Sequence, residues 1–314
     1  MREPVLTPAR PLSLPLIGAS YGEVLRSPRW RWWNPVVAWV LAIVLGLVAV
    51  FVPMLVYGFT VAATTGAEAF STDMEMTPSM TFVLNVSLAL LIVVSLAAVA
   101  IGFPVAARFL HSVEGRVRWA WLIRCVLVLL PLFVVYVVGV WALDGARSLG
   151  PSQGWPALLA MAVFMTPLQA AGEEYLFRGF VLASIGSCFR RPIVGLVVAG
   201  TLSTVLFAAA HGSMDPWILI DLGGIAVACV YLTWRTGGLE AAVALHTTNN
   251  VVVFFLGILT GTVSESYVDN TTTGTPEQAL VSVAVSALAT VLLLWQAKRV
   301  GVHRAVPASV GARP

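Results

Sequence analysis

Charged residues are scarce in this chain of 314 residues: Asp, Glu, Lys and Arg together make up 11% of it, whereas hydrophobic residues make up 59%. A mean hydropathy of +0.90 excludes an ordinary soluble domain. Several apolar runs approach or exceed the ~20 residues that a helix needs to cross a bilayer. They lack the polar–apolar alternation of barrel strands, and a lipid-embedded backbone must satisfy its own hydrogen bonds. The sequence therefore predicts an all-α, polytopic membrane protein.

Cysteine is also rare. The three cysteines, Cys125, Cys188 and Cys229, lie in or beside apolar segments, and no CxxC pair occurs. This pattern excludes a disulfide framework and a paired-cysteine metal site. The basic residues are spread over many short loops, which indicates membrane topology and gives no reason to expect a nucleic-acid partner. The first ~30 residues are rich in Pro and Arg without a compact apolar stretch, so no cleavable signal peptide is expected.

About eight transmembrane helices are expected, in the approximate ranges 35–61, 80–106, 119–143, 155–188, 193–211, 217–234, 239–259 and 279–297. We expect one transmembrane domain over residues 34–299, with cytoplasmic tails at 1–33 and 300–314. Every Lys and Arg except Arg147 then lies on the cytoplasmic side or at the cytoplasmic end of a span, as the positive-inside rule requires. The expected location is the cytoplasmic membrane, with both termini in the cytoplasm and the lipid bilayer as a partner.

The stretch AAGEEYLFRGF, residues 170–180, places Glu173, Glu174 and Arg178 inside an otherwise apolar segment. Each such group costs about 2.5–3.5 kcal/mol to insert into a membrane, so all three need a structural or functional reason. Glu174 and Arg178 are four residues apart and can pair on one helical face. Glu173 is turned by about 100° and has no partner at helical spacing, which suits a general base.

Two of the four histidines lie in or at the ends of apolar spans. His246 has Asn250 four residues later on the same helical face. His211 comes four residues after Phe207, so the phenyl ring can pack beside the imidazole. Each of these has a structural explanation when taken alone, but together with the Glu pair they indicate a site. The other two histidines are expected to be solvated: His111 and His303.

Two chemistries fit this set. In the first, Glu173, His211 and His246 bind a zinc ion whose water attacks a carbonyl, although the HExxH helix of the zincins is absent. In the second, Glu173 and His211 activate water directly, and His246 and Asn250 stabilise the oxyanion as hydrogen-bond donors. Asn is a poor zinc ligand but a good oxyanion donor, which favours the second chemistry for Asn250. The cofactor therefore stays open between zinc and none.

Three pieces of the chain carry a family resemblance: EEYLFR at 173–178, FAAAH at 207–211 and HTTNN at 246–250. In order and rough spacing they resemble the EExxxR, FxxxH and HxxxN motifs of the CPBP family. That family contains the type II CAAX prenyl endopeptidases and bacterial proteins linked to bacteriocin processing and self-immunity. The resemblance covers residues 155–260, the motif-bearing core in helices four to seven.

This resemblance implies an intramembrane endopeptidase of the CAAX type, metallo- or glutamate-dependent. Its substrate would be a peptide or protein in or at the membrane, prenylated or embedded in lipid. By motif position, Glu173 would be the catalytic base and His211 its partner, with His246 and Asn250 as the remaining site pair. Supporting roles would fall to Glu174, Arg178 and Phe207. Two other classes stay open: a non-catalytic scaffold or bacteriocin-immunity partner that retains the fold, and a small-solute carrier.

Straight, flush spans would keep the two histidines apart. Counted at ~1.5 Å per residue from the cytoplasmic ends, His246 lies about 10 Å deep and His211 about 30 Å deep. Residues 155–188 would form about 50 Å of helix, which is too long for one perpendicular span. We therefore expect a long, tilted or broken fourth helix with an interfacial segment near 187–192.

Overall fold

Helices account for 74% of the chain in the computed structural model, which describes residues 13–65, 76–143, 145–146 and 148–310. Within those residues there is no strand, and eight helical stretches are long and apolar enough to cross a membrane. Both findings confirm the expected fold class. The outermost parts of the two expected tails, residues 1–12 and 311–314, lie outside the described residues, as does Arg147.

The eight stretches lie close to the ranges expected from the sequence. The first four are α1 (Trp33–Thr65), α2 (Pro78–Ala89) with α3 (Leu91–Gly102), α4 (Trp119–Leu143), and the composite of α5 (Trp155–Phe164), α6 (Thr166–Glu174), η4 (Tyr175–Val181) and α7 (Leu182–Gly186). The last four are α8 (Pro192–Ala210), α9 (Pro216–Thr236), α10 (Glu240–Thr260) and α11 (Pro276–Val300). Short 3₁₀ turns complete the chain: η1 (Tyr21–Glu23), η3 (Ala107–Leu110), η5 (Val263–Ser266) and η6 (Ala308–Val310).

Local signals explain where these helices begin and end. Proline occupies the first position of α2, α8, α9 and α11, where its missing N–H leaves no helical hydrogen bond unmade. Asp215 caps α9 by accepting hydrogen bonds from the N–H groups of Trp217 and Ile218 at 2.9 and 3.1 Å. At its other end, α9 is followed by Gly237 in the left-handed conformation, φ 65°. The boundaries therefore follow from sequence, while the lengths follow from the apolar runs.

The fourth span is broken, as its length predicts. α5 and α6 are separated at Met165, and Pro167 at the second position of α6 cannot donate a backbone hydrogen bond to the preceding turn. After Glu174 the helix continues as η4, a π-helical turn. The chain then leaves the helix over residues 187–191 before α8 begins. This is the segment that the sequence predicts to be non-spanning.

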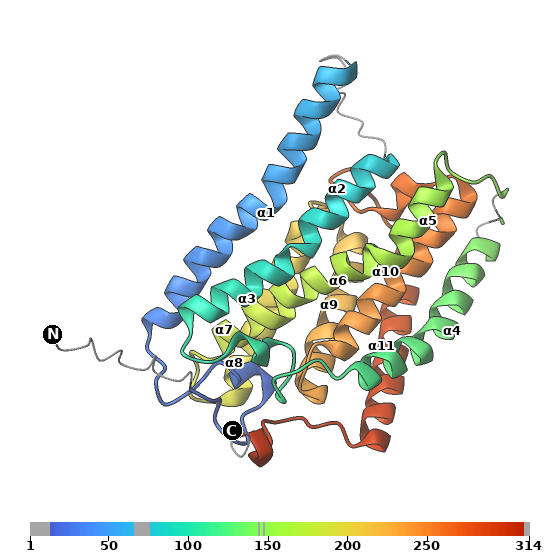
Figure 1. Cartoon of the computed structure of the whole chain (residues 1–314). Helices are drawn as coiled ribbons and strands as arrows, with labels where there is room; N and C mark the ends of the chain where they lie inside the picture. The colour runs from blue at the N-terminus through green and yellow to red at the C-terminus, as the bar shows by residue number, and fades with distance from the viewer. Residues whose placement is uncertain (1–12, 66–75, 144, 147, 311–314) are drawn as a thin grey trace.

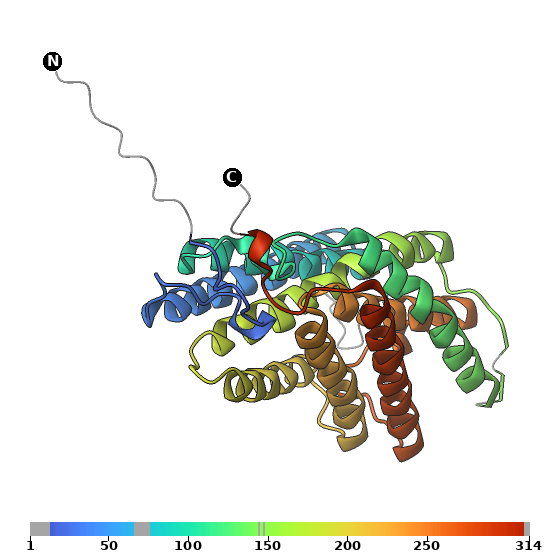
Figure 2. The ribbon, with the colours of Figure 1, turned by 90° about the horizontal axis from the view of Figure 1, so that it is seen from below.

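α10 lies in the middle of the bundle. It packs against α4, α6 and α9, while α11 packs on α9 and α4 (Figure 1). Seen from below, α1, α2 and α3 form one side of the molecule, and α8, α9 and α11 form the other (Figure 2). α6 and α10 lie between these two sides, so the two helices with the most motif residues are covered by neighbours.

The motif segment lies between two apolar cores. Phe177 of η4 belongs to a core built from α4, α9, α10 and α11. Tyr175 and Phe180 of the same turn belong to a second core that includes Tyr21 and residues of α3. Because both sides of η4 are packed, its backbone and the carboxylates just before it are held in place from two directions.

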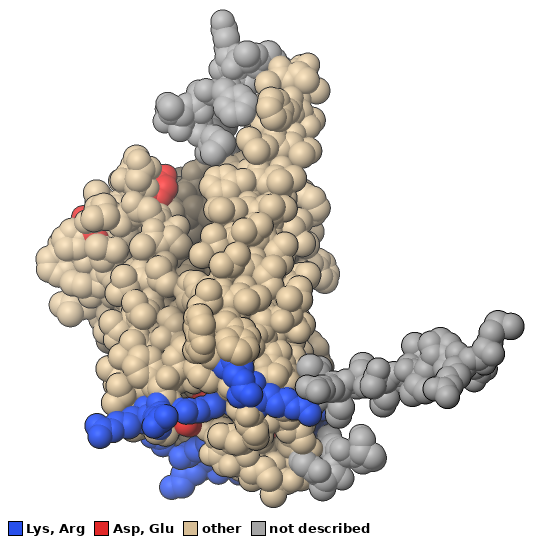
Figure 3. Space-filling model, turned by 90° about the vertical axis from the view of Figure 1, so that its left-hand side faces the viewer, with Lys and Arg blue, Asp and Glu red and all other residues tan. Residues whose placement is uncertain are grey.

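Basic side chains gather at one end of the molecule. On the face shown in Figure 3 they form a band near the lower end, while acidic side chains are visible near the upper end as well as within the band. The two terminal segments meet each other directly, since the Gly18 N–H donates to the Val306 carbonyl and the Val306 N–H donates to the Ala19 carbonyl, each at 2.9 Å. Both segments therefore lie on the same side, as an even number of spans requires.

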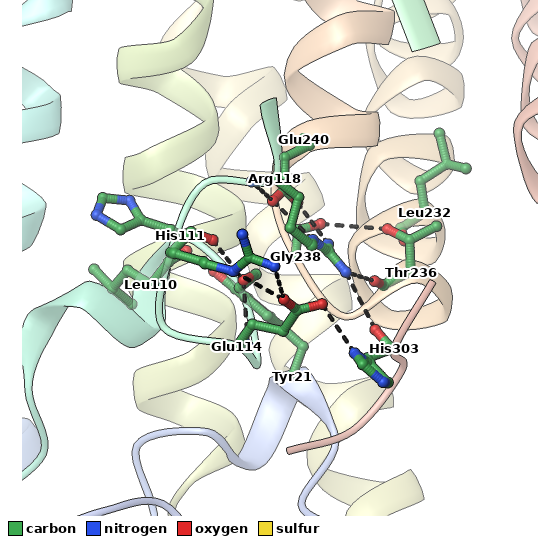
Figure 4. Close-up of polar contacts among 12 residues, drawn as sticks. Tyr21, Leu110, His111, Glu114, Arg118, Leu232, Thr236, Gly238, Glu240 and His303 are labelled. Atoms are coloured by element: carbon green, nitrogen blue, oxygen red, sulfur yellow. Dashed lines mark hydrogen bonds and ion pairs between the residues drawn. The ribbon is translucent and has the colours of Figure 1, made fainter. Parts of the chain in front are cut away.

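A buried ion pair at this end sets the position of α10 (Figure 4). Arg118, just before α4, and Glu240, the first residue of α10, are 8% and 3% exposed. The Arg118 Nε and Nη2 donate to Glu240 Oε1 and Oε2 at 2.9 and 2.6 Å. Its Nη1 donates to the carbonyls of Thr236 and His303 at 2.9 and 3.3 Å. One guanidinium thus connects α4, the α9–α10 turn and the C-terminal segment.

The two remaining histidines lie around this ion pair. His303 is exposed, as expected, and its Nδ1 lies 2.9 Å from Glu114 Oε1. His111 is not freely solvated: it is half-buried, and its Nδ1 makes a short hydrogen bond with the Tyr175 hydroxyl. Burial lowers the pKa of His111 below its ordinary value of 6.5. The expectation of a solvated residue is therefore wrong for His111, because the 103–118 loop folds back onto η4.

Candidate active site

Glu173 and Glu174 end α6, and Arg178 lies in the π-helical turn that follows. π-helical turns are frequent at functional sites. Arg178 Nη1 lies 2.9 Å from Glu174 Oε1, and both side chains are fully buried, so the ion pair predicted from their spacing is confirmed. The Arg178 guanidinium also lies over the Phe207 ring, with Cζ 4.3 Å from the ring centroid.

His246 reaches this pair from α10. Its Nδ1 lies 2.9 Å from Glu174 Oε1, and its Nε2 lies 3.5 Å from Glu173 Oε2. Because a carboxylate only accepts hydrogen bonds, Nδ1 carries a proton, and this N–H donates a hydrogen bond to Glu174. In the neutral imidazole, Nε2 is then an acceptor that faces Glu173. The first and third motifs therefore meet through two carboxylates and one imidazole.

Phe207 packs against both histidines of the motifs. The centroid of its ring is 4.7 Å from that of His211 and 5.6 Å from that of His246. His211 follows α8 directly, and its Nδ1 lies 2.9 Å from the Phe207 carbonyl. One aromatic ring thus contacts both histidines. Among the described residues His211 makes no hydrogen bond or ion pair with Glu173, so the second motif touches the site through Phe207.

Gln169 is a site residue that the sequence reasoning missed. Its Nε2 donates to Glu173 Oε1 at 2.9 Å, and its Oε1 accepts from Asn250 Nδ2 at 3.4 Å. The expectation that Glu173 has no partner at helical spacing is therefore wrong. The signal was present in the sequence, because Gln169 precedes Glu173 by four residues and such residues share a helical face.

Two carboxylate oxygens of the site have no hydrogen-bond partner among the described residues: Glu173 Oε2 and Glu174 Oε2. Glu173 Oε2 is buried and makes no hydrogen bond with any of the described residues, although its side chain as a whole is 8% exposed. An unsatisfied buried carboxylate oxygen is costly in the folded state. Such an atom is a candidate for holding a water or a proton during a reaction.

The three metal-ligand candidates do not form a ligand set. Across the described part of the chain there is no group of three or more His, Cys, Asp and Glu side chains placed to hold one metal ion. Both ring nitrogens of His246 already face carboxylates, and His211 Nδ1 faces a backbone carbonyl. The arrangement of Glu173, His211 and His246 therefore does not fit a metal, and no step below is routed through one.

Comparison with known proteins supports the family resemblance predicted from the three motifs. Residues 155–252 match the family model described as type II CAAX prenyl endopeptidase Rce1-like. The chain is 31% identical over 96 residues to the uncharacterized protein YyaK of Bacillus subtilis (strain 168), a match that covers 30% of this chain and 32% of that relative. The matched part thus spans about a third of the curated relative. No solved structure matches.

Proposed function

Taking the resemblance of residues 155–252 to Rce1-like endopeptidases as the premise, we propose that this membrane protein hydrolyses a peptide bond with water activated at Glu173. One observation carries the proposal: Glu173 Oε2 is buried, makes no hydrogen bond within the described residues, and lies 3.5 Å from His246 Nε2. A general base must offer a free lone pair at the reacting position. Glu174 Oε2 is also without a hydrogen-bond partner among the described residues, but the Glu174 side chain is fully buried and bound to Arg178, whereas Glu173 is 8% exposed.

The proposed chemistry follows from two hydrogen-bond acceptors that lie side by side, one on Glu173 and one on His246. Glu173 Oε2 and neutral His246 Nε2 both accept hydrogen bonds, so a water held between them can lose a proton to one of them as its oxygen attacks the carbonyl carbon of the substrate. The proton then passes to the amine nitrogen as the C–N bond breaks. One water is consumed, and a carboxylic acid and an amine are released. His246, once protonated, is a donor for the oxyanion.

The other motif residues hold the side chains of Glu173 and His246 in place. Glu174 accepts from His246 Nδ1 and from Arg178, which fixes the imidazole in the tautomer that leaves Nε2 free. Phe207 packs against both histidines and the Arg178 guanidinium. We propose that His211, whose ring packs against Phe207, is the partner of Glu173 in handling the substrate and water.

The proposed substrate is a peptide or protein in or at the membrane, prenylated or embedded in lipid. The site lies within helices that are apolar enough to span a bilayer, so a substrate must reach it from the membrane or from a membrane surface. The proposed location is the cytoplasmic membrane with both termini in the cytoplasm. The basic band of Figure 3 and the contact between the two terminal segments support this orientation.

The test uses purified protein in proteoliposomes and two fluorogenic peptides that end in the same CAAX sequence, one farnesylated and one not. We expect cleavage by the wild type and a loss of at least about a hundred-fold in Glu173→Gln, because a general base contributes that much or more. Glu277→Gln is the matched control, since Glu277 is an exposed residue in the first turn of α11. A chelator is added in a parallel series.

Each result decides a different point. Full activity of Glu173→Gln would contradict the assignment of Glu173 as the general base. A wild type that cleaves neither peptide contradicts a CAAX-type specificity and favours the scaffold or immunity partner. Activity that the chelator removes and zinc restores would make the site a metal centre, which requires Glu173 and the two histidines to move together from the arrangement described above.

A further inference from the structure

Three side-chain amides form a chain that ends on the proposed base. Asn249 Nδ2 donates to Asn250 Oδ1 at 3.1 Å, Asn250 Nδ2 donates to Gln169 Oε1 at 3.4 Å, and Gln169 Nε2 donates to Glu173 Oε1 at 2.9 Å. All three amides are half-buried. The chain joins α10 to α6 and reaches the carboxylate on the oxygen that does not face His246.

The direction of this chain is fixed by chemistry. A carboxylate accepts hydrogen bonds only, so Gln169 must turn its NH₂ group toward Glu173 and its carbonyl oxygen away. That oxygen needs a donor, which the Asn250 NH₂ group provides, and the Asn250 oxygen in turn accepts from Asn249. Each amide therefore holds the next one in a single orientation, and all the dipoles point their positive ends at Glu173.

We propose that Gln169 is a positioning residue, and that Asn250 acts on the reaction through Gln169. This inference rests on the proposed function. The amide chain occupies Glu173 Oε1, which leaves Oε2 as the oxygen that takes the proton from water. The chain also restrains the orientation of the carboxylate, because tilting its plane away from the observed one would lengthen the hydrogen bond from Gln169. The role of Asn250 is thus to keep the Gln169 amide from flipping.

Two readings of Asn250 make different predictions. If Asn250 contributed only as an independent oxyanion donor, its loss and the loss of Gln169 would multiply, because the two would act on different atoms. If Asn250 acts through Gln169, the second substitution adds little once the first is made. Interaction energies of this kind are what a double-mutant cycle measures.

The experiment measures kcat and KM on a cleaved peptide for Gln169→Leu, Asn250→Ala and the double variant, beside Glu173→Gln. We expect Gln169→Leu to lower kcat by about ten- to a hundred-fold with little change in KM, since it removes a hydrogen bond to a charged group and leaves the substrate contacts in place. The double variant should fall no more than about three-fold below Gln169→Leu. Gln278→Leu is the control, because Gln278 caps the first turn of α11 far along the chain.

Gln169→Glu supplies a readout that a loss of packing cannot imitate. A protonated carboxyl at this position can still donate to Glu173 and accept from Asn250, whereas an ionised one repels Glu173. Its activity relative to the wild type should therefore be about ten-fold higher near pH 6 than near pH 8.5. Gln169→Leu should show no such dependence when compared in the same way.

The outcomes separate this inference from the proposed function. An inactive Glu173→Gln together with a fully active Gln169→Leu, or with strictly multiplicative losses in the cycle, overturns the amide chain and leaves the base assignment intact. A fully active Glu173→Gln overturns both. A pH-independent Gln169→Glu in a folded sample, judged by the same elution volume as the wild type, also contradicts the positioning role.

Discussion

Removing Arg118 should destabilise the protein far more than removing an exposed charge at this end of the molecule. Its side chain makes four charge-assisted hydrogen bonds: two to Glu240 at 2.9 and 2.6 Å, and two to the carbonyls of Thr236 and His303 at 2.9 and 3.3 Å. In Arg118→Met the Glu240 carboxylate, only 3% exposed, would keep the backbone N–H of residue 118 as its donor but would lose its cation. Breaking a buried pair by removing one partner costs about 3–5 kcal/mol.

The magnitude can be checked against a neighbouring pair of the same type. Arg116 and Glu114 lie 2.8 Å apart, but the Arg116 side chain is 60% exposed, and exposed pairs contribute about 0–1 kcal/mol. Arg116→Met is therefore the matched control. The double variant Arg118→Met/Glu240→Leu should recover most of the loss, because it removes the orphaned carboxylate together with its partner.

The assay is equilibrium unfolding in mixed micelles of a mild detergent and SDS, followed by near-ultraviolet circular dichroism. We expect Arg118→Met to shift the unfolding equilibrium by more than about a hundred-fold, since every 1.4 kcal/mol corresponds to ten-fold. Equal effects of Arg118→Met and Arg116→Met would refute the reasoning, because they would mean that burial of the pair does not govern its energy.

Two further predictions follow from packing and from titration. Gly172→Ala should lower both stability and activity, because a Cβ there would collide with the Leu88 carbonyl where α2 crosses α6. In the control Gly223→Ala the added Cβ has no atom within 4 Å, so the substitution should be neutral or stabilise the helix by about 0.5–1 kcal/mol. Equal unfolding midpoints of the two variants would contradict this. Because burial lowers the pKa of His111, the folded state resists its protonation, so stability is fully present above the ordinary pKa of 6.5 and is lost as the pH falls below it. Lowering the pH from about 7.5 to 5 should therefore reduce the free energy of unfolding of the wild type more than that of His111→Asn. Equal reductions in the two proteins would show that other groups dominate.

The sequence predicted most of the fold because lipid leaves few choices. Long apolar runs in a membrane protein become helices, and proline and glycine mark their ends, as Pro192 and Gly237 do for α8 and α9. The Glu174–Arg178 pair was predictable for a similar reason, since it depends only on a spacing of four along one helix. Local geometry is what a sequence carries most directly.

What the sequence did not predict depends on contacts between segments far apart in the chain. The approach of His246 Nδ1 to Glu174 needs the packing of α10 against α6, and the burial of His111 needs the 103–118 loop to lie on η4. Gln169 is a different kind of omission. Its spacing from Glu173 could be read from the sequence, but a search confined to charged residues and histidines passes over a neutral amide.

The charges of the buried cluster connect its structure to its proposed chemistry. Glu173, Glu174 and Arg178 with a neutral His246 carry a net charge of minus one, since two carboxylates face one guanidinium. A lone excess charge is costly in a dry interior. When the cluster takes a proton from water, the negative charge passes to the oxygen that attacks the carbonyl, so the total charge of the site stays at minus one and hydrogen-bond donors must stabilise it there. Exchanging Glu173 for Gln removes the carboxylate that accepts this proton, so it should stop the reaction, while the contacts of Glu174 with Arg178 and His246 stay in place.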